Sequence, residues 1–196
     1  LRIARAFDES GSDETGSDQT AAAFSRIATP VAKYWVCKRV PGVVYEALEC
    51  LGGNGYVEDA PLARFYREAP LNGIWEGSGN VICLDVLRAM GRNPESVDAL
   101  AQELGQAAGL DDRYDAHLKA LQADLVSGTV AEASARLLVE RMALALQACL
   151  LLRHAPSAVG AAFCETRLGG PRGQAYGAFT DTAASDAVLE RIFWDD

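Results

Sequence analysis

The sequence predicts an all-α protein, and three observations support this prediction. Apolar side chains recur every three or four residues through most of the 196-residue chain, as they do along one face of a helix. Glycine and proline stand at the ends of these stretches, where helices commonly stop and start. No run of alternating apolar and polar residues indicates a β-strand, and no internal repeat is evident.

The first half of the chain is expected to be helical apart from one loop. Residues 1–7 resemble the end of a helix, and residues 8–20 are acidic, rich in Ser and Gly and free of large apolar side chains, which predicts a mobile solvated loop. A helix is expected from about Ala21, with Pro30 marking either a kink or a new start. Further expected elements are an apolar helix face ending at 52–53, a short helix over 61–70 and a helix over 78–90.

The second half continues with helical spacing. Segments 97–107, 114–125 and 130–153 each carry an apolar stripe, and a further helix is expected to end at 169–170. A glycine-rich loop then leads to a last helix around 188–193. The Asn93-Pro94 step predicts a boundary, which divides the chain into domains 1–91 and 92–196.

Composition narrows the class of protein. No stretch approaches the roughly 18–20 apolar residues of a membrane span, and the first residues do not form a secretory signal. Five cysteines without a C-x-x-C pair predict reduced thiols in a cytoplasmic protein and no metal site. The net charge of −9 argues against non-specific phosphate binding. A start at Leu1 inside a helical pattern suggests a fragment of a longer chain.

Unusual residues concentrate in 49–80. Residues 51–56, Leu-Gly-Gly-Asn-Gly-Tyr, place three glycines after an apolar helix, which indicates either a ligand loop whose backbone approaches a phosphate or a helix end with a tight turn. Residues 72–80 place Glu76 between Trp75 and Gly77 at the mouth of a helix. Glu76 is therefore either a general base, made suitable by an apolar flank and an adjacent glycine, or a helix-start acid favoured by the macrodipole, with Ser78 or Asn80 as N-cap.

These clusters resemble a known family. Residues 51–56, the run Ala-Arg-Phe-Tyr-Arg-Glu at 63–68 and the run Ile-Trp-Glu-Gly-Ser at 74–78 are similar, in order and spacing, to the C-terminal signature of acyl-CoA dehydrogenases over about residues 21–90. The resemblance implies an FAD-dependent homo-oligomer. It also implies that this chain holds the second half of the C-terminal four-helix bundle, followed by an additional helical domain.

The resemblance also implies roles for individual residues. Glu76 matches the base that takes the α-proton of an acyl-CoA thioester, with hydride passing to the flavin; some family members instead carry the base on an upstream helix. Cofactor-binding positions are matched by Glu49, Gly52, Gly53, Trp75, Ser78 and Asn80. Family members usually have Gln where Glu49 stands. Substrate-pocket positions are matched by Leu71, Ile74, Trp75 and Gly77.

A subgroup within the family resembles the chain further. Residues 67–80, 83–88, 29–31 and 37–39 are similar to the AidB-type proteins, which are associated with the response to DNA alkylation and carry a helical extension implicated in DNA binding. Residues 92–196 fit that extension in length, yet their net charge is −6. The arginines that would meet DNA are Arg113, Arg136, Arg141, Arg153, Arg167 and Arg172.

Three functions therefore remain open. The first is a dehydrogenase acting on an acyl-CoA-like thioester, and the second is a DNA-protecting flavoprotein of the AidB type. The third is a helical oligomerisation module with a vestigial site.

Overall fold

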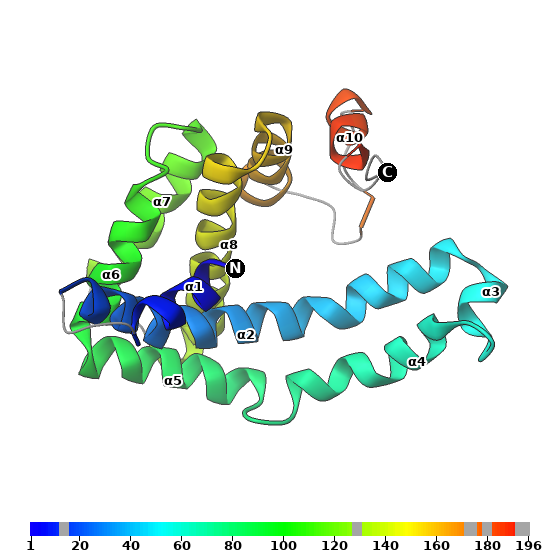
Figure 1. Ribbon diagram of the computed structural model, residues 1–196, viewed down its shortest axis with the longest axis horizontal. Helices are drawn as coiled ribbons and strands as arrows, with labels where there is room; N and C mark the ends of the chain where they lie inside the picture. The colour runs from blue at the N-terminus through cyan, green and yellow to red at the C-terminus, as the bar shows by residue number, and fades with distance from the viewer. Residues whose placement is uncertain (12–15, 127–130, 171–175, 178–181, 191–196) are drawn as a thin grey trace. The chain divides into compact units, whose positions relative to one another are not determined.

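Figure 1 shows the computed structural model, which describes residues 1–11, 16–126, 131–170, 176–177 and 182–190. Within these ranges the secondary structure is entirely helical, which confirms the all-α class. The elements are α1 (Arg2–Glu9), α2 (Gly16–Cys50), α3 (Gly53–Tyr56), α4 (Pro61–Glu68), the 3₁₀ turn η1 (Ala69–Gly73), α5 (Gly79–Arg92), α6 (Pro94–Gly105), α7 (Asp112–Val126), the 3₁₀ turn η2 (Glu132–Ser134), α8 (Ala135–His154), α9 (Ser157–Leu168) and α10 (Thr182–Leu189).

The chain forms two compact units. The first contains residues 1–100 and 129–140, and the second contains residues 101–128 and 141–196. The expected boundary at 91–94 coincides with the junction of α5 and α6, whereas the two units divide within α6 and α8. The start of the sequence-predicted second domain therefore packs with the first unit.

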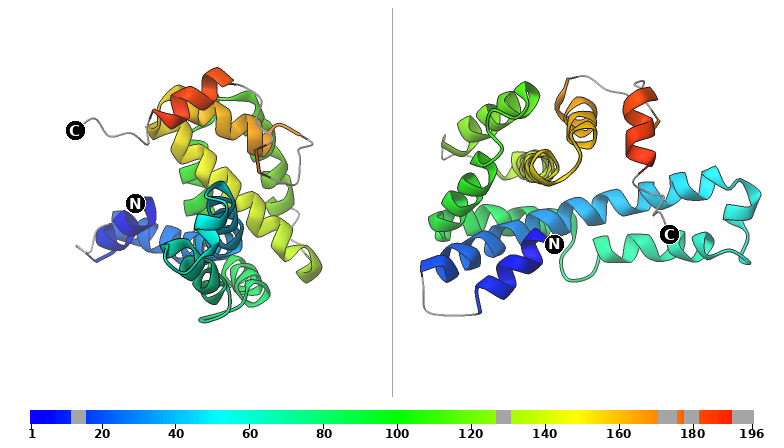
Figure 2. Two further views of the ribbon diagram at one scale, coloured as in Figure 1. Left: turned by 90° about the vertical axis from the view of Figure 1, so that its right-hand side faces the viewer. Right: turned by 45° about the horizontal axis from the view of Figure 1, so that its top comes forward.

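In the first unit, α2 is the element on which the others are arranged. The chain turns at α3, and α4, η1 and α5 return along α2 in the opposite direction (Figures 1 and 2). Phe24, Ile27 and Val31 of α2 are buried, as are Cys83 and Val86 of α5. This apolar layer fixes α5, and with it the segment that precedes α5, against the middle of α2.

The C-terminal half of α2 is less buried than its N-terminal half. The apolar face expected over residues 40–51 is present, but Val43 is 51% exposed and Leu51 is 54% exposed. On the returning limb, Phe65 and Tyr66 of α4 are also exposed. The first unit therefore exposes several large apolar side chains around its α3 end.

Helix α2 runs through two prolines. Pro30 and Pro41 both lie inside it, so of the two alternatives expected at Pro30, a kink or a new start, the new start is wrong. A proline removes one helical hydrogen bond and leaves the carbonyl four residues earlier without its partner. For Pro41 the carbonyl without a partner belongs to Cys37. Its oxygen lies close to Gly73, since a Cβ added at Gly73 would be 3.7 Å from it.

The acidic segment 8–20 is more helical than its composition predicts. Asp8 and Glu9 complete α1, and α2 begins at Gly16, so helix covers both ends of the expected loop. Arg5 stabilises the end of α1 through a 2.6 Å contact between its Nε and Glu9 Oε1. Residues 12–15, in the middle of the segment, lie outside the described residues.

The second unit has its own core. Tyr114 is fully buried, and its hydroxyl donates a 2.7 Å hydrogen bond to the carbonyl oxygen of Leu104. The buried Glu103 carboxylate accepts a hydrogen bond of 2.9 Å from Arg153 Nη1. The half-buried ring of His117 donates from Nε2 to the carbonyl of Arg141 at 2.9 Å. These contacts satisfy polar groups inside an otherwise apolar cluster.

The helices of the described residues include none that is long and apolar enough to cross a membrane.

Candidate active site

The segment that carries Glu76 connects η1 to α5. Ser78 is the N-cap of α5, but its hydroxyl does not accept the usual capping hydrogen bond. Glu76 lies two residues before that cap, outside the helix. Glu76 therefore stands where the helix-start interpretation with Ser78 as N-cap places it, just before the first turn of α5.

The backbone at Glu76 is strained. Its φ angle is +54°, which makes it the one non-glycine residue with positive φ among the described residues. Side chains with a Cβ avoid this left-handed region at a cost of about 1–2 kcal/mol. Gly77 follows with a φ of +107°, which glycine adopts readily. Strain of this kind persists only where surrounding contacts hold it, and it is concentrated at functional sites.

Lys33 of α2 supplies such contacts. Its ammonium group donates to the carbonyl oxygen of Trp75 at 3.0 Å and to that of Glu76 at 2.9 Å. The same nitrogen lies 3.7 Å from Glu76 Oε2. Trp75 is held from the other side of the segment, where its indole N–H donates to Asn72 Oδ1 at 3.1 Å.

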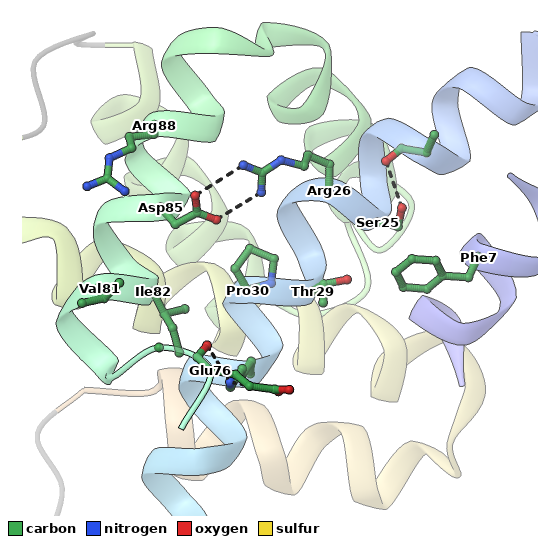
Figure 3. Close-up of a pocket in the computed structure, with 13 residues that line it drawn as sticks. Phe7, Ser25, Arg26, Thr29, Pro30, Glu76, Val81, Ile82, Asp85 and Arg88 are labelled. Carbon is green, nitrogen blue, oxygen red and sulfur yellow. Dashed lines mark hydrogen bonds and ion pairs between the residues drawn. The ribbon is translucent and has the colours of Figure 1, made fainter. Parts of the chain in front are cut away.

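A cavity of about 630 Å³ opens beside Glu76 (Figure 3). Glu76 lies at one end of it, and at the other end Arg26 forms a 3.2 Å ion pair with Asp85. Pro30 and Ile82 are among the apolar residues between these two ends. The full lining is Phe7, Ala22, Ser25, Arg26, Thr29, Pro30, Lys33, Glu76, Gly77, Val81, Ile82, Asp85 and Arg88. The carboxylate of Glu76 is 72% exposed, so it can meet a ligand without first leaving a buried contact.

The glycine turn lies at the α3 end of α2. Gly52 has a φ of +56°, and an added Cβ at Gly52 or Gly53 would meet no atom within 4 Å. The exposed backbone of this turn leaves room for a bulky ligand. Glu49, one turn earlier, is exposed as well, and its carboxylate raises the pKa of Tyr45. A carboxylate here works against a phosphate group.

The remaining residues that were expected at the site do not all lie in the cavity beside Glu76. Gly77 shares the cavity with Glu76, whereas Leu71 lines a second hollow of about 300 Å³ between α2, α4 and η1. Ile74 and Trp75 are 67% and 54% exposed and line neither space. Ser78 and Asn80 are exposed at the start of α5.

Three of the six candidate DNA-binding arginines are paired with acids. Arg113 contacts Asp111 at 2.7 Å and Arg153 contacts Glu103 at 2.9 Å. Arg141 forms an ion pair with Asp124. These pairs weaken the local positive field that a phosphate backbone requires.

The other three arginines are in different situations. Arg136 belongs to the first unit, where its Nε donates to the hydroxyl of Tyr34 at 3.2 Å. Arg167 is exposed on α9, and Arg172 lies outside the described residues. No cluster of acids, histidines and cysteines suited to a metal ion occurs within the part of the chain that the structure describes.

Sequence reasoning missed several residues of the cavity. Lys33, Arg26 and Asp85 carry no local signal, since a charged residue on an amphipathic helix ordinarily faces solvent. Only the packing of α2 against α5 brings them to the cavity that Glu76 also lines.

Comparisons with known proteins identify relatives of this chain. Residues 2–91 match the family model of the acyl-CoA dehydrogenase C-terminal domain. AidB of Escherichia coli strain K12 is 37% identical over 168 residues, which cover 86% of this chain and 30% of that protein. Acyl-CoA dehydrogenase family member 11 of Caenorhabditis elegans is 38% identical over 98 residues, or 50% of this chain and 16% of that protein.

A solved structure extends the likeness to nearly the whole chain. The crystal structure of Caenorhabditis elegans ACDH-11 in complex with C11-CoA is similar with a TM-score of 0.74 and 27% sequence identity. The match covers 98% of this chain and 36% of that one. This chain therefore spans only about a third of the length of such relatives.

Proposed function

The chain belongs to the acyl-CoA dehydrogenase family through residues 2–91, and on that premise we propose that it contributes Glu76 as the base of an FAD-dependent dehydrogenation of an acyl-CoA thioester. The observation that supports this most directly is the state of Glu76. It is a strained, exposed carboxylate on the rim of a cavity of about 630 Å³. A residue held in this conformation against its own preference indicates a functional constraint.

The residues of this chain have distinct roles in the proposal. The Glu76 carboxylate takes the α-proton of the thioester, and its backbone N–H helps to hold the thioester carbonyl as negative charge develops there. Gly77 has no side chain, so the substrate can approach the base closely. A bound FAD supplies the acceptor for the β-hydrogen as hydride. The ligand class is consistent with the C11-CoA present in the ACDH-11 structure.

The residues that would hold FAD fit it unevenly. Ser78 offers a hydroxyl that is not used as a helix cap, and Asn80 is exposed beside it. Gly52 and Gly53 offer open backbone. Glu49 does not suit a phosphate, so we propose that the flavin contacts lie at the glycine backbone and at the start of α5 rather than at Glu49.

Absorbance spectroscopy of the full-length protein tests the proposal. Addition of C11-CoA should bleach the flavin bands, and Glu76→Gln should abolish bleaching while the flavin stays bound. Glu58→Gln is a matched control, because Glu58 is an exposed glutamate of the same unit that pairs with Arg67, away from the cavity. Bleaching that survives in Glu76→Gln would assign the base to another residue.

DNA binding of the AidB type is a second candidate. The alignment with AidB is longer than residues 2–91, so it includes part of the extension. Binding to duplex DNA should then weaken with rising salt, and neutralising Arg136 or Arg167 should weaken it further. Absence of binding at low salt would exclude this role. The acid-paired arginines already reduce its electrostatic basis.

Assembly with further copies is also part of the proposal. The exposed apolar residues near α3, which include Val43, Leu51, Phe65 and Tyr66, would be covered in a homo-oligomer.

A further inference from the structure

Lys33 is unusual because its ammonium group binds two backbone carbonyl oxygens as well as lying near an acid. The two carbonyl groups it binds, at 3.0 Å and 2.9 Å, belong to Trp75 and Glu76. These carbonyls lie in the two rigid peptide planes on either side of the Glu76 Cα. Only the φ and ψ angles of Glu76 relate the two planes to each other. A single cation that holds both oxygens therefore restricts the combinations of φ and ψ that Glu76 can adopt.

The conformation that is fixed is the disfavoured one. Glu76 has a φ of +54°, and nothing in a glutamate side chain supports that angle. The segment also lacks a covering layer, since Trp75 is 54% exposed and the Glu76 side chain is 72% exposed. Packing on these two side chains is therefore limited, and the hydrogen bonds from Lys33 are charge-assisted, in addition to the 3.1 Å bond from the Trp75 N–H to the carbonyl oxygen of Leu71.

The ion pair between the two side chains is the lesser interaction. Lys33 Nζ and Glu76 Oε2 are 3.7 Å apart, which is too long for a hydrogen bond, and the carboxylate is open to water. Exposed pairs of this kind contribute little. The Lys33 side chain itself is only 25% exposed, so its charge is directed towards the segment rather than towards solvent.

We propose that Lys33 is a positioning residue, which holds the backbone of Glu76 in the left-handed conformation that keeps the carboxylate at the rim of the cavity. This proposal rests on the proposed function of Glu76. Lys33 reaches the segment from the middle of α2, 43 residues earlier in the chain, so the geometry of the base depends on the contact between α2 and the segment before α5.

The test compares Lys33→Met, which removes the donors, with Lys33→Arg, which retains a cation with several donors. Lys119→Met is the matched control, because Lys119 is an exposed lysine of α7. Hydrogen–deuterium exchange of the full-length protein is measured over residues 72–79 by mass spectrometry. We expect faster exchange in Lys33→Met, and exchange like the wild type in Lys33→Arg and Lys119→Met. Unchanged exchange in Lys33→Met would overturn the proposal.

A kinetic measurement separates positioning from mere stabilisation. In Lys33→Met, the limiting rate of flavin bleaching at saturating C11-CoA should fall on the order of 100-fold, as expected for a misplaced reacting group. The half-saturating C11-CoA concentration should stay within about twofold, and Lys33→Arg should recover most of the rate. A rate that is unchanged, or one that Lys33→Arg leaves as low as Lys33→Met does, would refute positioning.

The two proposals fail in different ways. If Glu76→Gln still bleaches, the proposed function fails, and the exchange measurement still reports whether Lys33 holds the segment. If Glu76→Gln abolishes bleaching and Lys33→Met bleaches normally, only the role of Lys33 fails. Circular dichroism checks that each variant is folded. Should Lys33→Met not fold, Lys33→Ala, which also removes the donors, takes its place, with the same increase in exchange expected and unchanged exchange again overturning the proposal.

Discussion

Replacing Gly55 with alanine would show how closely α3 packs against the end of α2. An added Cβ would lie 2.2 Å from the backbone oxygen of Leu48, 3.0 Å from its carbonyl carbon and 3.1 Å from its Cα. Backbone atoms in a helix cannot rotate aside as a side chain can. Overpacking costs about 1–3 kcal/mol, and because the obstacle here is backbone we expect a loss of about 3 kcal/mol.

Two neighbouring glycines serve as matched controls. At Gly53 an added Cβ would meet no atom within 4 Å and φ is not positive, so alanine should stabilise the protein by about 0.4–1 kcal/mol through the unfolded state. At Gly52 the space is also open, but φ is +56°, so alanine should cost about 1–2 kcal/mol. The expected order of destabilisation is therefore Gly55, then Gly52, then Gly53.

Urea unfolding followed by far-ultraviolet circular dichroism measures this order. With a slope of about 2 kcal/mol/M, a loss of about 3 kcal/mol lowers the unfolding midpoint by about 1.5 M. Equal midpoints for Gly55→Ala and Gly53→Ala would refute the reasoning, because the two substitutions differ mainly in the backbone oxygen that the new methyl group meets.

Three further predictions concern buried groups of the second unit. Arg153→Met should destabilise by about 3–5 kcal/mol in urea unfolding, because it leaves the buried Glu103 carboxylate without its cation; a loss below about 1 kcal/mol would contradict this. Burial lowers the pKa of His117 below its ordinary 6.5, so the unfolded chain takes up the proton first and stability falls as pH drops from about 6.5 towards the folded pKa. His117→Gln should flatten that dependence of the urea midpoint, and an unaltered slope would contradict the assignment. Burial raises the pKa of Cys164 to about 11, so a thiol reagent at neutral pH should label the exposed Cys50 and spare Cys164, as peptide mass spectrometry would show; equal labelling would contradict it.

Much of the fold could be predicted because helix ends are signalled locally. Pro61 opens α4 where a proline at the first helical position predicts it, and the glycines at 52–53 end α2 as expected. Pro30 leaves two possibilities open, a kink or a new start, since its local cost of about 3 kcal/mol argues against a regular helix. The side chains of Ile27 and Val31 on either side of it are buried, and such packing offsets this cost. Helix α5, which packs against α2, begins 49 residues after Pro30, and no local pattern reveals that contact.

The candidate site likewise contains some features that the local sequence reveals and others that only the folded chain reveals. Composition around Glu76 allowed either a base or a helix-start acid, and only the resemblance over residues 51–78 favoured the base. The structure adds that Glu76 precedes the N-cap of α5 and has a φ of +54°, a strained conformation on which the proposed role rests. The agent that holds this angle could not be found from the sequence, since Lys33 is one of many lysines and arginines on amphipathic helices. Lys33 is distinguished by the two carbonyl oxygens that its ammonium group binds. This contact exists only after the chain has folded back along α2. If the base is set by this contact, variants that shift α2 against α5 without touching Glu76 should slow proton abstraction more than they weaken thioester binding.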